Sequence, residues 1–107
     1  MNKKIKCILI DLDGTIINSG PDLIDSLNFV LRNQNMKPIE KRIIGSLVGG
    51  GAKAMITRAY QNLKLKPPLN IDPLVQEFLG YYFNNCSNSS FLYPNVFNTL
   101  KELKSKF

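Results

Sequence analysis

The chain has 107 residues, and its 14 lysine and arginine residues outnumber its eight acidic residues to give a formal net charge of +6. This length fits one small domain. The sequence has no histidine, which excludes Ser-His-Asp and Cys-His nucleophiles, an imidazole base and Cys/His zinc sites. Cys7 and Cys86 are far apart and form no C-x-x-C pair, so neither a redox motif nor a disulfide framework is indicated, and a reducing compartment is expected.

The first predicted element is a strand over Lys4–Asp11. Its run Cys7-Ile-Leu-Ile10 is apolar without strict alternation, which is typical of a strand buried on both faces of a parallel sheet. We therefore expect Cys7 to lie in the core. Asp13-Gly14 is a turn signal that ends the strand. The apolar run is too short for a membrane span or a signal peptide, so the sequence predicts a soluble, cytoplasmic protein without a membrane partner.

Helical patterns follow the turn. From Pro21, leucine and valine side chains recur at i, i+4, i+7 and i+8, forming one apolar stripe that ends near Asn33. In chain order, the further predicted helices are Glu40–Leu47, Ala52–Asn62, roughly Asp72–Cys86, and a last helix from Pro94 with Val96, Leu100 and Leu103 facing inward. Tyr81 and Tyr82 are expected to pack in the helical core, and Cys86 to be a small buried residue.

The predicted strand has no recognisable partner. A buried strand without neighbours would leave its N–H and C=O groups unpaired. The last predicted helix runs to the end of the sequence, where a βα crossover would next deliver a strand. These two features predict that the sequence is an incomplete part of a larger α/β protein.

The segment Asp11-Leu-Asp13-Gly14-Thr15 carries the most specific chemistry. Side chains at i and i+2 of a strand share one side, so both carboxylates are expected to face one site at the strand's carboxyl end, where open α/β sheets bind ligands. Two adjacent carboxylates repel unless a cation relieves them, and Mg²⁺ prefers such oxygen ligands. Gly14 allows a sharp turn whose N–H groups can cradle an anion.

This segment resembles the first motif of the haloacid dehalogenase superfamily of phosphotransferases. Thr15–Leu23 resembles the start of the helical cap in phosphoglycolate phosphatases, and Val48-Gly-Gly-Gly-Ala52 with Arg58-Ala59 resembles their cap loop and the helix after it. Leu92-Tyr-Pro-Asn-Val96 resembles the return to the core domain. The likeness spans nearly the whole chain in register.

The resemblance implies an α/β fold: a Rossmann-like core, of which this N-terminal portion holds only the first strand and the returning helix, with an inserted α-helical cap. Residues 1–17 would be the core strand and catalytic loop, 18–90 the cap, and 91–107 the truncated return to the core. The superfamily's second to fourth motifs (a Ser or Thr, a Lys, and acidic metal ligands) would lie beyond Phe107.

The resemblance also implies a Mg²⁺-dependent phosphate monoester hydrolase, with 2-phosphoglycolate as its small phosphorylated substrate. Asp11 would be the nucleophile that becomes an aspartyl phosphate, and Asp13 the acid and then the base. Mg²⁺ would be held by Asp11 and Asp13. The residues implied to hold the substrate are Gly14, Thr15, Gly49, Gly50, Gly51 and Arg58. The presence of Asp13 favours phosphate chemistry over dehalogenation.

Two residues depart from the family pattern. Asn18 stands where many relatives carry Asp, and Gly50 stands where phosphoglycolate phosphatases usually carry Asn. Gly50 removes a possible hydrogen bond to the substrate, so the phosphoglycolate assignment is weaker than the phosphatase one. The three glycines are also typical of a flexible connection between helices that has no role in binding. Lys53 and Arg58 are likewise typical of solvated surface cations on a helix.

Other functions stay open. Within the same superfamily, a sugar-phosphate phosphatase or a phosphomutase is the alternative to a phosphoglycolate phosphatase. A catalytically inactive fragment or interaction module fits the missing motifs. Nucleic-acid binding is not expected, because the basic residues are scattered and lack an interleaved aromatic platform.

Overall fold

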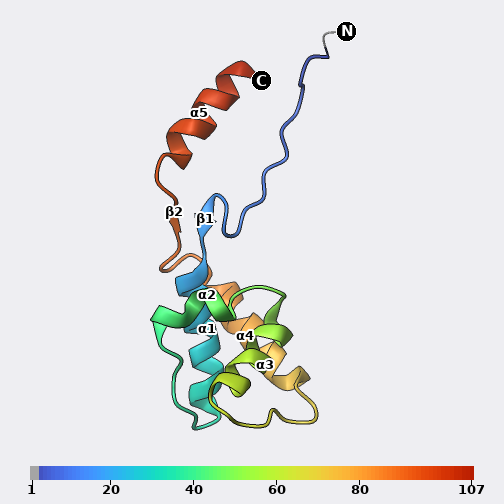
Figure 1. Ribbon diagram of the computed structural model, residues 1–107, viewed down its shortest axis with the longest axis vertical. Helices are drawn as coiled ribbons and strands as arrows, with labels where there is room; N and C mark the ends of the chain where they lie inside the picture. The colour runs from blue at the N-terminus through green and yellow to red at the C-terminus, as the bar shows by residue number, and fades with distance from the viewer. Residues whose placement is uncertain (1–2) are drawn as a thin grey trace.

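Helices dominate the computed structural model, which describes residues 3–107 (Figure 1). In chain order the elements are strand β1 (Ile17–Asn18), α1 (Gly20–Asn33), the 3₁₀ helix η1 (Lys41–Ile43), α2 (Ile44–Leu47), α3 (Ala52–Asn62), α4 (Asp72–Asn85), strand β2 (Phe91–Leu92) and α5 (Val96–Lys106). The predicted helical segments are confirmed, and α3 has the predicted bounds. The predicted helix Glu40–Leu47 is divided into η1 and α2.

Helix α1 follows from its sequence. Pro21 stands in its first turn, where the missing N–H costs nothing, and Arg32 in the last turn complements the helix dipole. Of the predicted apolar stripe, Leu27, Val30 and Leu31 are fully buried, and Leu23 is partly buried against the same core. The helix ends where Asn35 takes a left-handed conformation, φ 57°, and the N–H of Met36 donates to Leu31 O.

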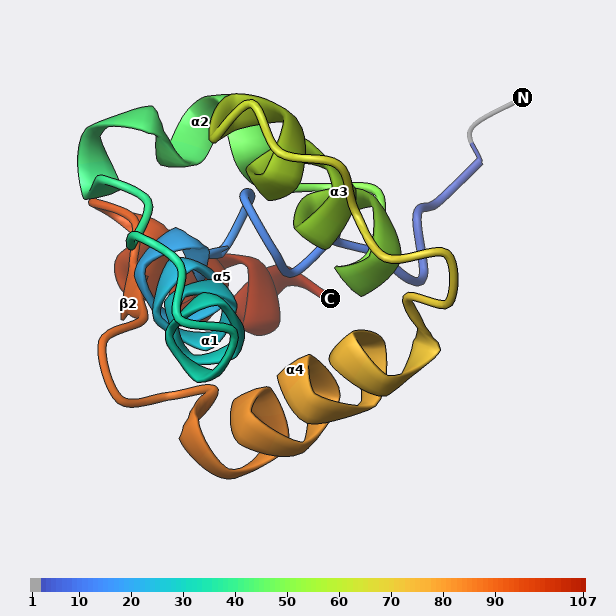
Figure 2. The same cartoon turned by 90° about the horizontal axis from the view of Figure 1, so that it is seen from below.

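The helices α1, α3 and α4 enclose one hydrophobic core. Seen from below, α1 lies beside α4, with α2 and α3 across from α4 (Figure 2). Each fully buried aliphatic side chain in it stabilises the fold by roughly 1.5–3 kcal/mol. The core residues are Ile24, Leu27, Val30, Leu31, Ile39, Leu47, Met55, Ile56, Ala59, Tyr60, Ile71, Leu74 and Phe78.

The segments that lead into and out of this helical bundle, residues 20–85, lie side by side. Strands β1 and β2 pair antiparallel, with Ile17 opposite Leu92 and Asn18 opposite Phe91. This short pairing was absent from the sequence prediction, because two-residue strands leave no periodicity to detect. It keeps the segments before and after the bundle together.

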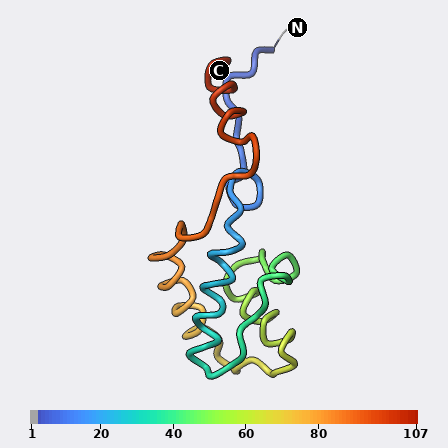
Figure 3. The backbone as a smooth tube through the Cα atoms, turned by 90° about the vertical axis from the view of Figure 1, so that its left-hand side faces the viewer, coloured from blue at the N-terminus to red at the C-terminus, as the bar shows by residue number. Residues whose placement is uncertain are grey.

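The predicted buried strand Lys4–Asp11 is wrong for this structure. Residues 3–12 run extended but are not paired in a strand, and Leu9 is 94% exposed. The physical reason is that a parallel strand is stable only between neighbours that take its N–H and C=O groups. This segment and α5 project from the bundle in the same direction (Figure 3), in a molecule 58 × 27 × 23 Å in extent.

Three burial predictions also need correction. Cys7 and Cys86 are exposed free thiols and not core residues. In α5, Val96, Leu100 and Leu103 are only partly buried, since they share shallow grooves with the extended N-terminal segment and have no packed core to enter. Within residues 3–107, none of the helices has the length and apolarity needed to cross a membrane.

Candidate functional site

The acidic turn, residues 11–17, is closed by hydrogen bonds within its own backbone. Gly14, with φ +76°, donates its N–H to Ile17 O at 2.8 Å. The N–H groups of Thr15, Ile16 and Ile17 all point to Leu12 O, at 3.3, 3.0 and 3.1 Å. These four amides are therefore occupied within the turn in this structure. An anion held by backbone N–H groups would have to compete with Leu12 O or use other amides.

The two predicted catalytic carboxylates lie on this turn and are exposed. The hydroxyl of Thr15 donates to Asp11 Oδ2 at 3.4 Å. Asp13 lines a cavity of about 550 Å³. Among the described residues, Asp11 and Thr15 do not line it. The structure thus brings Asp13 to the cavity wall and keeps Asp11 beside it on the turn.

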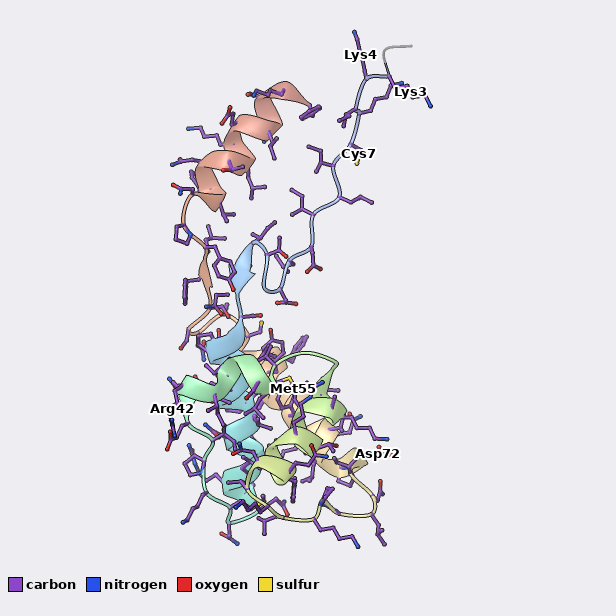
Figure 4. All side chains as sticks on the ribbon, in the orientation of Figure 1. Lys3, Lys4, Cys7, Arg42, Met55 and Asp72 are labelled. Atoms are coloured by element: carbon purple, nitrogen blue, oxygen red, sulfur yellow. The ribbon has the colours of Figure 1, made fainter. Side chains whose placement is uncertain are left out.

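The cavity lies between the acidic turn and the helical bundle. Asp13 and Gly14 form one side, and Gly49 and Gly51, between α2 and α3, form part of the other. Met55, labelled in Figure 4, belongs to the bundle side. The apolar and aromatic lining includes Leu23, Val48, Met55, Phe78, Leu79 and Tyr82. Segments far apart in sequence therefore meet at one site, as the two motifs would require.

Three consecutive glycines shape the bundle side. Gly49, Gly50 and Gly51 have φ of +111°, +79° and +92°, values that side chains with a Cβ rarely adopt. Gly51 is also the N-cap of α3. Gly49 and Gly51 line the cavity, whereas Gly50 is not part of the lining, and a Cβ on it would meet Ala54 and Arg58. The predicted contact of Gly50 with substrate is untested and stays a prediction.

Arg58 is directed to the backbone. Its Nη1 donates to Leu47 O at 3.1 Å and to Gly49 O at 2.5 Å. The side chain is partly buried and, among the described residues, it is not part of the cavity lining. Its predicted role in holding the substrate stays a prediction, and the hydrogen bonds present here go to the backbone at Leu47 and Gly49.

Tyr82 and Tyr93 also line the cavity, although the sequence did not single them out for this site. Burial raises the pKa of Tyr82, and the negative charge of Asp13 raises it further. Tyr82 also stacks on Phe78, with ring centroids 6.2 Å apart, as predicted for core packing. The sequence signal was ambiguous because aromatic residues lie on overlapping faces of α4.

Asn18 is a further lining residue at the start of the bundle. Its Oδ1 accepts a hydrogen bond from Gly20 N at 3.1 Å, which fixes the side chain beside the first turn of α1.

The donor set of the turn fits Mg²⁺ in part. Asp11 and Asp13 supply two hard carboxylate donors, and proteins often bind Mg²⁺ through one or two carboxylates with water and phosphate oxygens completing the octahedron. Within residues 3–107 no group of three or more His, Cys, Asp or Glu side chains is gathered as a metal site. This chain would thus contribute two ligands at most from its acidic side chains.

The described chain thus presents an exposed Asp-x-Asp-Gly turn beside an apolar cavity. The model of the family described as haloacid dehalogenase-like hydrolase matches residues 8–107, and the chain belongs to this family. Its fold is haloacid dehalogenase-like.

Curated relatives carry phosphatase names. "Phosphoglycolate phosphatase" of Haemophilus influenzae (strain 86-028NP) is 38% identical over 99% of this chain and 50% of the relative. "Phosphoglycolate phosphatase" of Agrobacterium fabrum is 34% identical over 89% of this chain and 41% of the relative. "N-acetylmuramic acid 6-phosphate phosphatase" of Pseudomonas aeruginosa is 32% identical over 87% and 40%. The chain spans about half the length, or less, of these relatives.

A solved structure agrees with this placement. The crystal structure of a predicted phosphoglycolate phosphatase from Haemophilus somnus 129PT superposes with a TM-score of 0.75 at 32% identity. The match covers 89% of this chain and 44% of that chain. The likeness therefore extends over most of the chain but less than half of the solved one.

Proposed function

We propose that this chain is the nucleophile-bearing part of a Mg²⁺-dependent phosphate monoester hydrolase. The observation that carries the proposal is the cavity shared by Asp13 and the glycine loop, residues 48–51, because it joins the catalytic motif to the segment that resembles a cap loop. In this proposal residues 1–17 form the catalytic segment and residues 18–90 form the cap. Residues 91–107 lead the chain back to the core domain.

The proposed chemistry uses the two aspartates in turn. A carboxylate oxygen of Asp11 attacks phosphorus while the ester P–O bond breaks, and Asp13 gives a proton to the leaving alkoxide. Asp13 then takes a proton from water, which attacks the phosphorus of the aspartyl phosphate and frees phosphate and Asp11. Mg²⁺, when held by Asp11 and the turn at Asp13, supplies charge neutralisation of the phosphoryl oxygens.

The helical bundle supports a cap role. It has its own core, and its two connections are paired at β1 and β2. A unit attached in this way can move as one body relative to the turn. In the proposed enzyme it covers the substrate, excludes water and contributes to specificity.

The first candidate substrate is 2-phosphoglycolate, which is suggested by the names of relatives. A sugar phosphate is the second candidate. It is favoured by the apolar and aromatic cavity wall and by the relative named for N-acetylmuramic acid 6-phosphate. We also propose a cytoplasmic location, on the basis of the cysteine usage in the sequence.

The test uses the protein expressed together with any sequence that follows Phe107 in its gene. Phosphate release from 2-phosphoglycolate and from a panel of sugar phosphates is measured with and without Mg²⁺. We expect Mg²⁺-dependent phosphate release that Asp11→Asn abolishes. The control is Asp25→Asn in α1, a carboxylate near Lys41 that does not line the cavity, and it is expected to retain phosphate release. Full turnover by Asp11→Asn would overturn the assigned nucleophile.

The same assay distinguishes the inactive alternative. The 107 residues alone are expected to release negligible phosphate, because the family's second to fourth motifs lie outside them. Substantial Mg²⁺-dependent turnover by this segment would contradict that expectation. Absence of turnover in the longer protein as well would favour the interaction module.

A further inference from the structure

We propose that Arg58 is a positioning residue, which sets the shape of the glycine loop and thereby the bundle side of the cavity. The proposal rests on the phosphatase function proposed above, and it assigns Arg58 a role through the loop and not through the substrate's charge. Gly50 is the second residue of this arrangement, since a Cβ there would lie 3.2 Å from Arg58 Nη2.

The hydrogen bonds place Arg58 across the loop. Leu47 is the last residue of α2, so its carbonyl has no partner further along that helix. Arg58 Nη1 donates to this carbonyl and to that of Gly49, two residues further on. One nitrogen on α3 thus ties the end of α2 to the first glycine of the loop. Hydrogen bonds from a charged donor are the stronger kind.

Gly50 lies close to the guanidinium of Arg58. A Cβ added at Gly50 would lie 3.2 Å from Arg58 Nη2 and 3.2 Å from Ala54 Cβ, closer than ordinary contacts, and its φ of +79° would be strained. A side chain at this position would therefore press on the guanidinium that holds the loop. This contact gives a structural reason for glycine at this position in this chain.

The loop needs such a tether. Glycine has no intrinsic preference between positive and negative φ, so three glycines in succession do not hold one conformation unaided. Two of them, Gly49 and Gly51, line the cavity opposite Asp13. Because Arg58 itself is outside the lining, its influence reaches the cavity through the carbonyl of Gly49.

Amide hydrogen exchange tests the tether on the 107-residue chain without any activity. We compare Arg58→Ala with Lys53→Ala, which removes an exposed cation from the same helix. Arg58→Ala is expected to speed exchange by about tenfold or more at the two hydrogen-bonded amides that flank the loop, while α1 amides stay within about twofold, as for local opening. These amides are Val48, which donates to Ile44 O at 3.0 Å, and Met55, which donates to Gly51 O at 3.1 Å. Unchanged loop exchange in Arg58→Ala would overturn the tether.

Kinetics of the protein expressed with any sequence that follows Phe107 distinguish two roles of Arg58: positioning the glycine loop, and direct recognition of the substrate's charge. The matched substrates are 2-phosphoglycolate and 2-hydroxyethyl phosphate, which differ by a carboxylate against a hydroxymethyl group. A positioning role predicts that Arg58→Ala lowers kcat/KM for both by the same factor. A loss confined to 2-phosphoglycolate would overturn the proposal, because it would show an ion pair with the substrate.

Gly50→Ala checks the coupling. It is expected to speed loop exchange in the wild-type background, and by a smaller factor in Arg58→Ala, because the strain from the φ of +79° remains there while the contact with the guanidinium is already gone. Full additivity would refute the coupling. If the wild-type protein releases phosphate from no substrate, the proposed function fails, while the exchange results still decide whether Arg58 holds the loop.

Discussion

Ser90 donates both its backbone N–H, at 2.6 Å, and its hydroxyl, at 2.5 Å, to Oδ2 of Asp22, a residue 68 positions earlier in the chain. The N–H of Ser89 adds contacts to both carboxylate oxygens at 2.9 Å. Asp22 is only 2% exposed. This Asp22–Ser90 clasp ties the first turn of α1 to the loop that leads into β2, and it fixes the two connections of the helical bundle beside each other.

Removing the clasp carboxylate is expected to destabilise the fold. Asp22→Ala leaves the N–H groups of Ser89 and Ser90 without their acceptor, and hydrogen bonds to a charged group contribute about 1.5–3 kcal/mol each. We expect a loss of about 3 kcal/mol in the free energy of unfolding, measured by urea denaturation. Asp25→Ala is the matched control on α1: its partner Lys41 is 3.8 Å away and exposed, so a change within about 1 kcal/mol is expected. Equal effects of the two variants would contradict this role.

The clasp also predicts a dependence of stability on pH. Burial alone would raise the pKa of Asp22, but the hydrogen bonds from Ser90 and Ser89 outweigh it and hold the pKa below its ordinary value of 3.8. Because the folded-state pKa is the lower one, this stabilisation is present above the ordinary value and is lost as the pH falls through the folded-state pKa. Urea midpoints at pH 7 and below pH 4 measure it. The gap between wild type and Asp22→Asn should shrink in acid, and a constant gap would count against the linkage.

Tyr82 should report the charge of Asp13. Burial raises the pKa of the Tyr82 phenol above 10.0, and the charge of Asp13 adds to the increase. Asp13→Asn is therefore expected to lower this pKa, though not to 10.0, since burial remains. NMR titration of tyrosine labelled at Cζ measures it residue by residue. Asp25→Asn, for which no charge contact with Tyr82 is present, should leave the pKa unchanged; an equal drop there would rule out the specific coupling.

Gly14 is expected to be required for its backbone conformation and not for space. An added Cβ would meet nothing within 4 Å, but the φ of +76° disfavours any side chain. Gly14→Ala should cost about 1–2 kcal/mol in the conformational energy of the turn. The matched control is Gly45→Ala in α2, which also meets nothing within 4 Å, has no positive φ and should be neutral or stabilising by up to about 1 kcal/mol. Because the turn can open without global unfolding, exchange at residues 12–17 is the measurement.

Sequence patterns were most informative where structure is local. The bounds of α3 and the buried stripe of α1 followed from apolar spacing, the glycines before α3 and the proline in α1. The acidic motif was likewise evident from its residues. A helix satisfies its own backbone hydrogen bonds within a few residues, so its signals are contained in the segment itself.

What depended on distant partners was decided by tertiary structure alone. The apolar segment before Asp11 has the composition of a strand, but it pairs with no strand here and stays exposed, because strand hydrogen bonds come from other parts of a chain. The direction of Arg58 toward Gly49 and the pairing of Asp22 with Ser90 could not be predicted for the same reason. Sequence predicted the residues proposed to carry the chemistry and correctly located the helices, while the cavity and its supports arise only when segments far apart in the chain are packed together.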